Sequence, residues 1–351
     1  MAEKVLMKGN EALAESALRA GCRFFFGYPI TPQTELAAYM SKRMPKVGGT
    51  FLQAESEIAA INMVYGAAAA GARVMTSSSS PGISLKGEGI SYMAGADLPG
   101  VIINVQRGGP GLGGIQPSQA DYWQATKALG HGDFQILVFA PSTVQEMVNL
   151  VSDAFDKADQ YRMPAMILAD GMLGQMMEPV ELPEKKAQAA IEKPWAACGH
   201  GGKRKHNIVN SLYLTPNALE DLVRERYARY EVIKANEQRA EEYRTEDADL
   251  IVVAYGASSR VARSAVNKAR EEGLKVGLVR PITLWPFPTD AIQRAAKQAK
   301  QLLVVEMSMG QMVDDVRLAA NCSVPVHFYG RTGGIIPTPK EVLGEIKKLL
   351  K

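Results

Sequence analysis

The stretch FLQAESEIAAINMVYGAAAAG, residues 51–71, places two carboxylates where an apolar strand gives way to a helix with almost no charge. Beyond its first turn the only polar side chains are Asn62 and the Tyr65 hydroxyl, which indicates that most faces of this helix are buried. A carboxylate in the first turn, from Glu55 or Glu57, would be carried inward with it. Because an ionised carboxylate is costly to bury alone, the sequence predicts a cation, a capping contact or a ligand here.

A second candidate is Arg107, which follows the apolar run GVIINV and precedes the glycine-rich segment GGPGLGG. At this place its guanidinium starts semi-buried and needs a carboxylate or a phosphate. Two interpretations stand: an internal ion pair with Glu55 or Glu57, or a ligand approached closely by a glycine backbone. The glycines favour the ligand. They do not match a dinucleotide-binding fingerprint, because no clear helix follows them.

The segment GYPITPQT, residues 27–34, has a structural and a functional interpretation. Pro29 stiffens the turn, Thr31 is placed to cap a helix, and Pro32 is placed at the first helical position. A capping threonine at the carboxyl end of a strand also presents its hydroxyl and nearby N–H groups to an anion. The residues alone leave both interpretations open.

The serines of TSSSSPG, residues 76–82, suggest a nucleophile. However, the sequence has no G-x-S-x-G motif, and its four histidines are poorly placed for a catalytic triad. A hydrolase is therefore the weaker hypothesis. The three cysteines are also scattered, with no C-x-x-C pair, so we expect inert thiols that cannot hold an iron–sulfur cluster alone.

These candidates must be positioned by alternating strands and helices, which the sequence predicts for residues 10–170. Strands are expected at RFFFGY, GTFLQA, RVMTSS, GVIINV, FQILVFA and PAMILAD. Among the helices, STVQEMVNLVSDAFDKADQY has the clearest apolar stripe, and the first should be capped by Asn10 and ended by Gly21. This alternation predicts an α/β fold with a doubly wound parallel sheet.

Ligands bind such sheets beyond the carboxyl ends of the strands, so four aperiodic loops should meet at one edge. They are GYPITPQT, QAESE, TSSSSPGISLKGEG and NVQRGGPGLGGIQPSQ. We predict three regions along the chain: a first domain at 1–182, a connector with a charged helical arm at 183–246, and a smaller α/β domain at 247–351.

Composition places the chain among folded proteins of two domains. Hydrophobic residues make up 46% and charged residues 22% of its 351 residues. The net charge of +3 gives no reason to expect nucleic acid or an anionic membrane as a partner. No uncharged apolar run approaches the roughly 18 residues that a membrane span needs, and the N-terminus does not resemble a signal peptide. A cytoplasmic protein is expected.

Several motifs in their joint order resemble the α subunit of the 2-oxoacid:ferredoxin oxidoreductases, and most closely the 2-oxoisovalerate type. They are GYPITPQTEL, QAESEIAAINMVYGAAAAGA, TSSSSPGISLKGEG, NVQRGGPGLGG, RPITLWPFP and YGRTGGIIPTP. The resemblance covers nearly the whole chain. It implies a pyrimidine-type thiamine diphosphate domain followed by a domain like the C-terminal domain of transketolase.

The resemblance also implies roles for individual residues. In the family a glutamate is followed nine positions later by a glycine, a spacing that Glu57 and Gly66 have and Glu55 lacks. Glu57 would therefore be the catalytic carboxylate at the aminopyrimidine of thiamine diphosphate, where it favours the imino tautomer. Thr31 and Arg107 would bind the substrate.

Five further residues are expected beside the coenzyme. They are Tyr28, Pro29, Ser80, Pro81 and Gly82.

The resemblance further implies partners, because the G-D-G motif that holds the diphosphate and Mg²⁺ in thiamine enzymes is absent. In the family that half-site lies on a β subunit, and [4Fe-4S] clusters lie on β and on a ferredoxin-like δ subunit, commonly with a γ subunit. The implied reaction is the CoA-dependent oxidative decarboxylation of a 2-oxoacid, with electrons passed to ferredoxin. Alone, the chain should be inactive.

Three alternatives stay open. The chain is a 2-oxoglutarate- or arylpyruvate-specific member of the same family, a transketolase-like or lipoamide-dependent thiamine enzyme, or a scaffolding subunit that kept the fold without the chemistry. No cluster of basic residues lies near the four loops in the sequence. Since 2-oxoglutarate would need such residues to bind its second carboxylate, their absence favours 2-oxoisovalerate.

Overall fold

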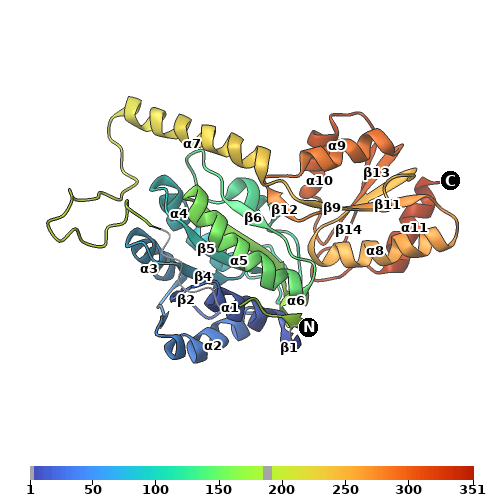
Figure 1. Cartoon of the computed structure of the whole chain (residues 1–351). Helices are drawn as coiled ribbons and strands as arrows, with labels where there is room; N and C mark the ends of the chain where they lie inside the picture. Colours follow the sequence, from blue (N-terminus) through green and yellow to red (C-terminus); the bar gives the residue numbers. More distant parts are fainter. Residues whose placement is uncertain (1–3, 185–191) are drawn as a thin grey trace.

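The computed structural model describes residues 4–184 and 192–351, and the expected alternation of strands and helices builds its first lobe (Figure 1). The strands of the main sheet are β2 (Phe24–Gly27), β3 (Thr50–Gln53), β4 (Val74–Ser78), β5 (Gly100–Gln106), β6 (Leu137–Phe139), β7 (Pro164–Asp170) and β12 (Thr283–Trp285). Their order across the sheet is β12-β6-β7-β5-β4-β2-β3. All pairs are parallel except β12 with β6. The predicted parallel sheet is therefore present.

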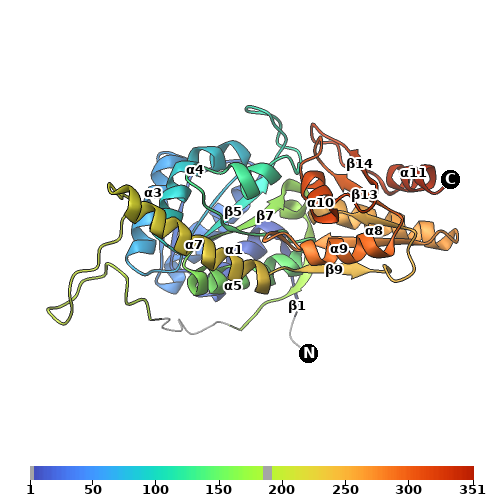
Figure 2. The ribbon, with the colours of Figure 1, turned by 90° about the horizontal axis from the view of Figure 1, so that it is seen from above.

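Helices pack on this sheet in two groups. They are α1 (Gly9–Arg19), α2 (Thr34–Arg43), α3 (Glu57–Ala69), α4 (Ser80–Gly95), α5 (Val144–Tyr161) and α6 (Gly171–Gln175), with a 3₁₀ turn η1 (Pro45–Val47) and a π-helical turn η2 (Gln124–Ala128). Helix α1 packs with α2 and α5, and α3 packs with α4. In Figure 2 the strands β5 and β7 run between α4 and α5. An antiparallel pair, β1 (Lys4–Lys8) with β8 (Met177–Glu181), lies outside the main sheet.

Two of the expected helix caps are wrong. Asn10 lies inside α1, whose N-cap residue is Lys8; its buried amide instead donates to the Pro32 carbonyl oxygen at 2.8 Å. Thr31 does not cap α2, which begins at Thr34 after Gln33. Gly21 does follow the end of α1, with the φ of +90° that glycine adopts freely.

The segment TSSSSPGISLKGEG is also not a loop, because α4 begins at Ser80 and runs to Gly95. Most of its residues are buried, including Gly82, Ile83, Lys86, Gly87 and Ile90. A helix packed on several sides carries no single apolar stripe, and its small residues hide the period that would have indicated it.

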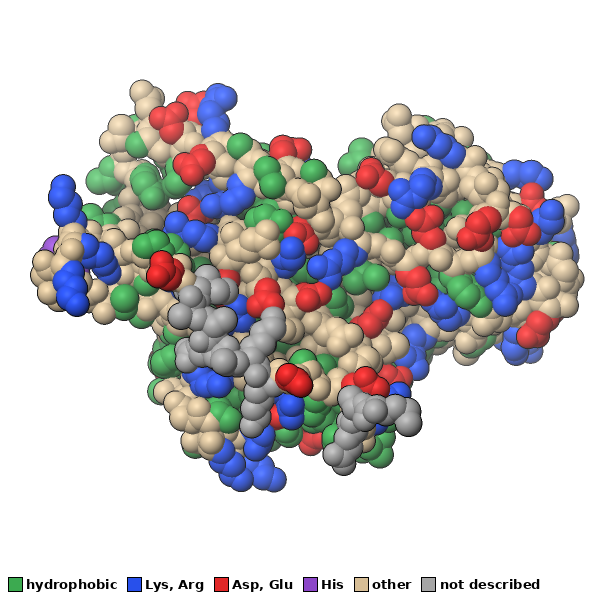
Figure 3. Space-filling model, in the orientation of Figure 1, with side chains coloured by type: hydrophobic (Ala, Val, Ile, Leu, Met, Phe, Trp, Pro, Cys, Tyr) green, Lys and Arg blue, Asp and Glu red, His purple; other side chains and the backbone are tan. Residues whose placement is uncertain are grey.

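The second lobe is a five-stranded sheet in the order β14-β13-β10-β11-β9. Its strands are β9 (Ala240–Tyr243), β10 (Leu250–Val253), β11 (Val276–Pro281), β13 (Gln301–Glu306) and β14 (Val326–Gly330). Its helices are α8 (Gly256–Glu271), α9 (Thr289–Gln298), α10 (Met312–Ala320) and α11 (Pro339–Leu349). Only β9 runs antiparallel to its neighbour. On the face seen in Figure 3, acidic and basic side chains interleave over this lobe.

The charged helical arm is α7 (Pro216–Asn236), which lies along the first lobe and leads to the second (Figure 1). It is not solvated on all sides. Arg226, Tyr230 and Ile233 are buried, and the Tyr230 ring meets the Trp285 ring with centroids 5.3 Å apart. Helix α7 thus braces β12, the strand that the C-terminal part of the chain adds to the first sheet. No helix among the described residues is long and apolar enough to cross a bilayer.

Gln119 fastens the two lobes together. This fully buried residue makes two hydrogen bonds to the Met307 backbone. Its side-chain oxygen accepts from the Met307 N–H at 3.0 Å, and its own backbone N–H donates to the Met307 carbonyl oxygen at 2.9 Å. Its amide also donates to the Tyr255 carbonyl oxygen at 2.8 Å. Because Gln119 lies a dozen residues beyond Arg107, this attachment fixes the glycine-rich loop against the second lobe.

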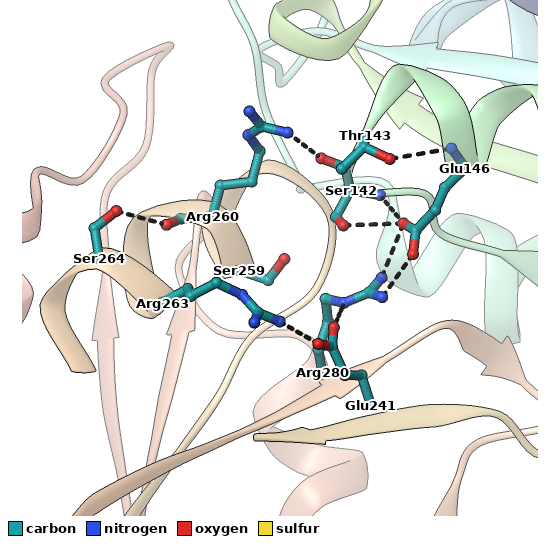
Figure 4. Close-up of a pocket in the computed structure, with 9 residues that line it drawn as sticks. All are labelled: Ser142, Thr143, Glu146, Glu241, Ser259, Arg260, Arg263, Ser264 and Arg280. Carbon is teal, nitrogen blue, oxygen red and sulfur yellow. Dashed lines mark hydrogen bonds and ion pairs between the residues drawn. The ribbon is translucent and has the colours of Figure 1, made fainter. Parts of the chain in front are cut away.

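A second attachment is a network of arginines and carboxylates around a cavity of about 480 Å³ (Figure 4). Arg280 of β11 makes two hydrogen bonds to Glu146 of α5, at 2.7 and 3.1 Å, and one to Glu241 of β9 at 2.8 Å. Arg263 pairs with Glu241 as well, and Arg260 pairs with Glu178 at 3.0 Å. The positive and negative charges are therefore balanced, and the network is an inter-lobe strut.

Replacing Arg280 with alanine should lower the free energy of unfolding by about 2 kcal/mol, because the buried Arg280 is the shared cation of Glu146 and Glu241, which are themselves partly exposed. The measurement is urea unfolding of the purified chain. Arg294→Ala is the matched control, since Arg294 pairs with Glu242 but its side chain is 60% exposed. That change should cost below about 1 kcal/mol. Equal costs for both variants would contradict the strut.

Candidate functional site

Glu57 is the first residue of α3, and its side chain is only 6% exposed. The helix is capped by Ser56, whose hydroxyl accepts a hydrogen bond from the Ala59 N–H at 3.1 Å. The carboxylate of Glu57 is therefore not used for capping. Among residues 4–184 and 192–351 it has neither a hydrogen-bond donor nor an ion-pair partner, whereas Glu55 is exposed. The expected buried carboxylate is Glu57.

The first turn of α4 lies directly against this carboxylate. A Cβ placed on Gly82 would stand 2.7 Å from Oε1 of Glu57 and 2.1 Å from Oγ of Ser78. Only glycine lets the two helices approach this closely. The positive ends of the α3 and α4 dipoles then both lie near the carboxylate, which stabilises its charge in the absence of a counter-ion contact.

Lys86, one turn further along α4, is fully buried beneath the start of α3. Its ammonium donates to the Glu57 backbone carbonyl at 3.3 Å. Burial lowers the pKa of Lys86 to about 8, and the nearby Glu57 charge opposes that shift. Lys86 therefore supplies positive potential at the base of Glu57 without occupying its carboxylate oxygens.

Arg107 is 7% exposed and makes no ion pair in the part of the chain that the structure describes. Its guanidinium donates to two backbone carbonyl oxygens, that of Thr31 at 2.9 Å and that of Leu112 at 3.0 Å. Its Nε is buried without a hydrogen-bond partner. The internal ion pair with Glu55 or Glu57 is thus wrong, and a buried guanidinium retains unused capacity for an anion.

Ser80 connects Arg107 to a buried polar network. Its hydroxyl accepts from the Arg107 N–H at 3.1 Å and donates to Asp121 at 2.5 Å. Asn104 donates to the same Asp121 oxygen at 2.9 Å and accepts from the Ser80 N–H at 3.2 Å. Burial raises the pKa of Asp121, although Ser80, Asn104 and the Arg107 charge oppose the shift. This network holds the start of α4 against the end of β5.

The loop after β2 completes the edge. Tyr28 is partly buried, Pro29 and Thr31 are exposed, and the Tyr28 carbonyl oxygen accepts from the Gln33 amide at 3.3 Å. Gln33 in turn accepts from the Ser77 hydroxyl of β4 at 2.6 Å. The loop is therefore tied to the neighbouring strand, and Thr31 is exposed on a backbone that these bonds and the Arg107 contact hold in place.

The structure thus joins the sequence-predicted residues into two contacts. Thr31 and Arg107 touch through a hydrogen bond, and Gly82 touches Glu57. Ser80 and Pro81 occupy the same helical turn as Gly82, between the two contacts.

Sequence reasoning missed the supporting polar residues, which are Lys86, Asn104, Asp121, Gln33 and Gln119. Only Lys86 and Asn104 could have been found from the sequence, because each is a polar residue within a mostly apolar segment.

Metal ligands are not gathered here: in the described ranges, no three or more His, Cys, Asp or Glu side chains are arranged to hold an ion. Burial raises the pKa of the Cys22 thiol to about 12, as expected of an unreactive core cysteine.

Family models match nearly the whole chain. Residues 15–246 match the model described as pyruvate flavodoxin/ferredoxin oxidoreductase, thiamine diphosphate-binding. Residues 248–342 match the model of pyruvate:ferredoxin oxidoreductase core domain II.

Individual relatives agree with these models. The chain is 51% identical over 347 residues to the ketoisovalerate oxidoreductase subunit VorB of Methanothermobacter thermautotrophicus, covering 98% of this chain and 97% of the relative. It is 37% identical over 377 residues to the 2-oxoglutarate synthase subunit KorA of the same organism, covering 99% and 100%.

Solved structures share the fold. A 2-oxoglutarate:ferredoxin oxidoreductase from Magnetococcus marinus, with 2-oxoglutarate, coenzyme A and succinyl-CoA bound, superposes with a TM-score of 0.89 at 28% identity. The match covers all of this chain and 66% of that one. A split-gene transketolase matches with a TM-score of 0.62 at 15% identity, which concerns the fold alone. The predicted fold class, a thiamine-type α/β domain followed by a transketolase-like one, is confirmed.

Lys86→Met should change how stability depends on pH. The folded-state pKa of about 8 lies below the ordinary value of 10.5. The unfolded state therefore binds more protons between these values, so the parent gains stability as pH rises through this window and loses it as pH falls through 8. The methionine variant lacks that dependence, and the stability difference between variant and parent should change by about 3 kcal/mol.

Urea unfolding of both proteins at pH 7 to 11 measures this difference. Lys300→Met is the control, because the Lys300 side chain is 80% exposed. Its difference from the parent should stay flat with pH. A flat Lys86→Met difference would show that burial does not lower the pKa of Lys86.

Proposed function

This chain belongs to the 2-oxoacid:ferredoxin oxidoreductase family, and we propose that it brings the catalytic carboxylate, Glu57, to an enzyme that oxidises 2-oxoisovalerate. In that reaction the 2-oxoacid loses CO₂, CoA takes the acyl group, and ferredoxin takes two electrons one at a time. The observation that carries the proposal is the buried Glu57 carboxylate, which no side chain of the described chain engages.

Thiamine diphosphate, which the family model implies, fits this site. Gly82 lets α4 lie flush against Glu57, so the carboxylate is buried on that side and its hydrogen-bonding capacity is unspent. Such a carboxylate is suited to a ring nitrogen of the aminopyrimidine, with Ser80, Pro81 and Gly82 beside the ring. When bound, the coenzyme supplies the electron sink for decarboxylation. Glu57 would hold and return the proton at the ring nitrogen.

Arg107 and Thr31 would hold the substrate. The Arg107 guanidinium is buried, is fixed by two carbonyl oxygens and has an Nε without a partner. A 2-oxoacid carboxylate would provide the negative counter-charge that this guanidinium lacks. The Thr31 hydroxyl, exposed next to it, would accept or donate a hydrogen bond at the carboxylate or keto oxygen. Tyr28 and Pro29 would shape the same edge at the coenzyme.

Partner subunits would supply the rest, as the subunit names of the relatives indicate. We propose a β subunit with the diphosphate and Mg²⁺ half-site, [4Fe-4S] clusters on β and a ferredoxin-like δ subunit, and a γ subunit. The face of α3 that starts beside Glu57 supports a partner there, since Ile58 is 50% exposed and Asn62 and Gly66 follow on the same exposed stripe. A cytoplasmic location, with ferredoxin as acceptor, belongs to this proposal.

The substrate assignment rests on two comparisons of unequal strength. Identity to the ketoisovalerate subunit is 51%, against 37% for the 2-oxoglutarate subunit. The division of the chain at residues 182 and 246 also stays a proposal.

Glu57→Gln tests the catalytic assignment. In the assembled complex, 2-oxoisovalerate-dependent ferredoxin reduction should fall by about 100-fold or more, because glutamine cannot exchange a proton with the ring nitrogen. Glu55→Gln is the matched control: Glu55 is two residues away and exposed, and its replacement should leave the rate unchanged. Thiamine diphosphate binding, followed by circular dichroism, provides a second measurement. A full rate in Glu57→Gln would refute the role of this residue.

Arg107→Met tests the substrate-binding assignment. Loss of a buried charge partner should lower kcat/KM for the 2-oxoacid at least about 30-fold. Arg107→Lys keeps the charge but cannot reach both carbonyl oxygens, so an intermediate loss is expected. Steady-state kinetics of the complex measure both. If Arg107→Met weakened assembly but left kcat/KM of the assembled fraction intact, the arginine would be structural only.

A further inference from the structure

Beside Thr31 the surface opens into a cavity of about 510 Å³ that the site residues named so far do not fill. Its walls come from four separate parts of the chain: the loop after β2, the glycine-rich loop, α6 with the residue after it, and the C-terminal lobe. They are Thr31, Pro32, Ile115, Gln116, Pro117, Gly171, Met172, Gln175, Met176 and Ile336. Ile336 belongs to the second lobe, so the cavity depends on the attachment between the lobes.

The cavity begins at the residues that Arg107 contacts. Arg107 donates to the Thr31 carbonyl oxygen at 2.9 Å and pairs with Pro117 through an isolated antiparallel bridge. Thr31 and Pro117 are both wall residues. Arg107 itself is not a wall residue, but Thr31, the other proposed substrate ligand, is. A 2-oxoacid held by Thr31 and Arg107 would therefore lie at the rim, with room in the cavity for the rest of the molecule.

The walls are uncharged. None of the ten residues is acidic or basic, and the large side chains are two isoleucines, two methionines and the uncharged amides of Gln116 and Gln175. Methionine is flexible and polarizable, so Met172 and Met176 can adapt to branched aliphatic groups. Such walls gain free energy from apolar substituents in proportion to the area removed from water.

An ion pair between Lys8 and Glu35 lies behind one wall. The Gln175 amide donates to Glu35 at 2.9 Å, and Asn10 donates to the same carboxylate oxygen at 2.9 Å. Lys8 lies 3.5 Å from the other oxygen of Glu35, with its side chain 37% exposed. The Lys8 cation behind this wall is therefore already paired with Glu35. A substrate with a second carboxylate would find no basic residue among the walls to pair with, which disfavours it.

We infer that this cavity receives the side chain of the 2-oxoacid and selects uncharged aliphatic groups over groups that end in a carboxylate. The inference rests on the proposed function and deepens it, since it assigns the substrate preference to Met172, Met176, Ile115 and Ile336. The cavity is larger than an isopropyl group, so the enzyme should accept longer branched substrates such as 4-methyl-2-oxovalerate with similar kcat/KM.

Two wall variants of the assembled complex test this inference against pyruvate, 2-oxoisovalerate, 4-methyl-2-oxovalerate and 2-oxoglutarate. Met172→Trp fills the cavity and should lower kcat/KM for the two branched substrates at least tenfold relative to pyruvate. Met176→Lys adds a cation and should raise the ratio of 2-oxoglutarate to 2-oxoisovalerate roughly tenfold. Met177→Lys is the matched control, because Met177 is the next residue, is 54% exposed and does not line the cavity.

Co-purification of the partner subunits shows that each variant has assembled, and Met172→Leu guards against a folding defect because it keeps an apolar wall of similar volume. If the wall variants changed kcat/KM for all four substrates by one common factor, or if Met177→Lys shifted the ratios as Met176→Lys does, the cavity would not select the side chain. That result would leave the proposed function intact. A parent complex that oxidised none of the four substrates would overturn the proposed function itself.

Discussion

Two buried side chains of opposite charge, Glu57 and Arg107, lie close to one helical turn without pairing with each other. The first turn of α4 separates them: the Ser80 hydroxyl bonds the Arg107 backbone, and Gly82 lies against the Glu57 carboxylate. Direct pairing would satisfy both charges and leave nothing for a ligand. The other features of the site follow from keeping them apart, since each charge must then be stabilised by groups that leave its functional atoms free.

Those stabilising groups are mostly backbone. Arg107 is held by the carbonyl oxygens of Thr31 and Leu112, and Glu57 lies near two helix N-termini with Lys86 bonded to its carbonyl oxygen rather than to its carboxylate. Backbone groups move little, so the charges are oriented in advance and lose little entropy when a ligand arrives. The attachment of Gln119 to the second lobe serves the same end at longer range, because it anchors the loop that carries Leu112.

Sequence reasoning succeeded where the signal was local and periodic. The strands after which Thr31 and Arg107 lie, and the stripe of α5, could be read directly, and a buried glutamate was implied by the uncharged helix that follows it. It failed for α4, because a helix buried on most sides has no helical period of apolar and polar residues. It also failed for Asn10, which donates a hydrogen bond to Pro32 instead of capping its own helix. Strand β12 was unreadable because its partner β6 lies far away in the sequence. The partners of Ser80 were missed for the same reason, since Asp121 and Asn104 meet it only after folding.

A site divided between chains, as proposed above, would also explain an unusual feature of α3. A helix with so few charges should be buried all round, yet Ile58 is half exposed and Gly66 has open space where a Cβ would stand. Such an exposed apolar and small-residue face is unfavourable in a lone chain. It would become favourable if the proposed partner covered it, and a partner on this face would lie beside Glu57, the first residue of the same helix. Burial of the interface and completion of the site would then be one event, so the carboxylate would meet its coenzyme only in the assembled enzyme.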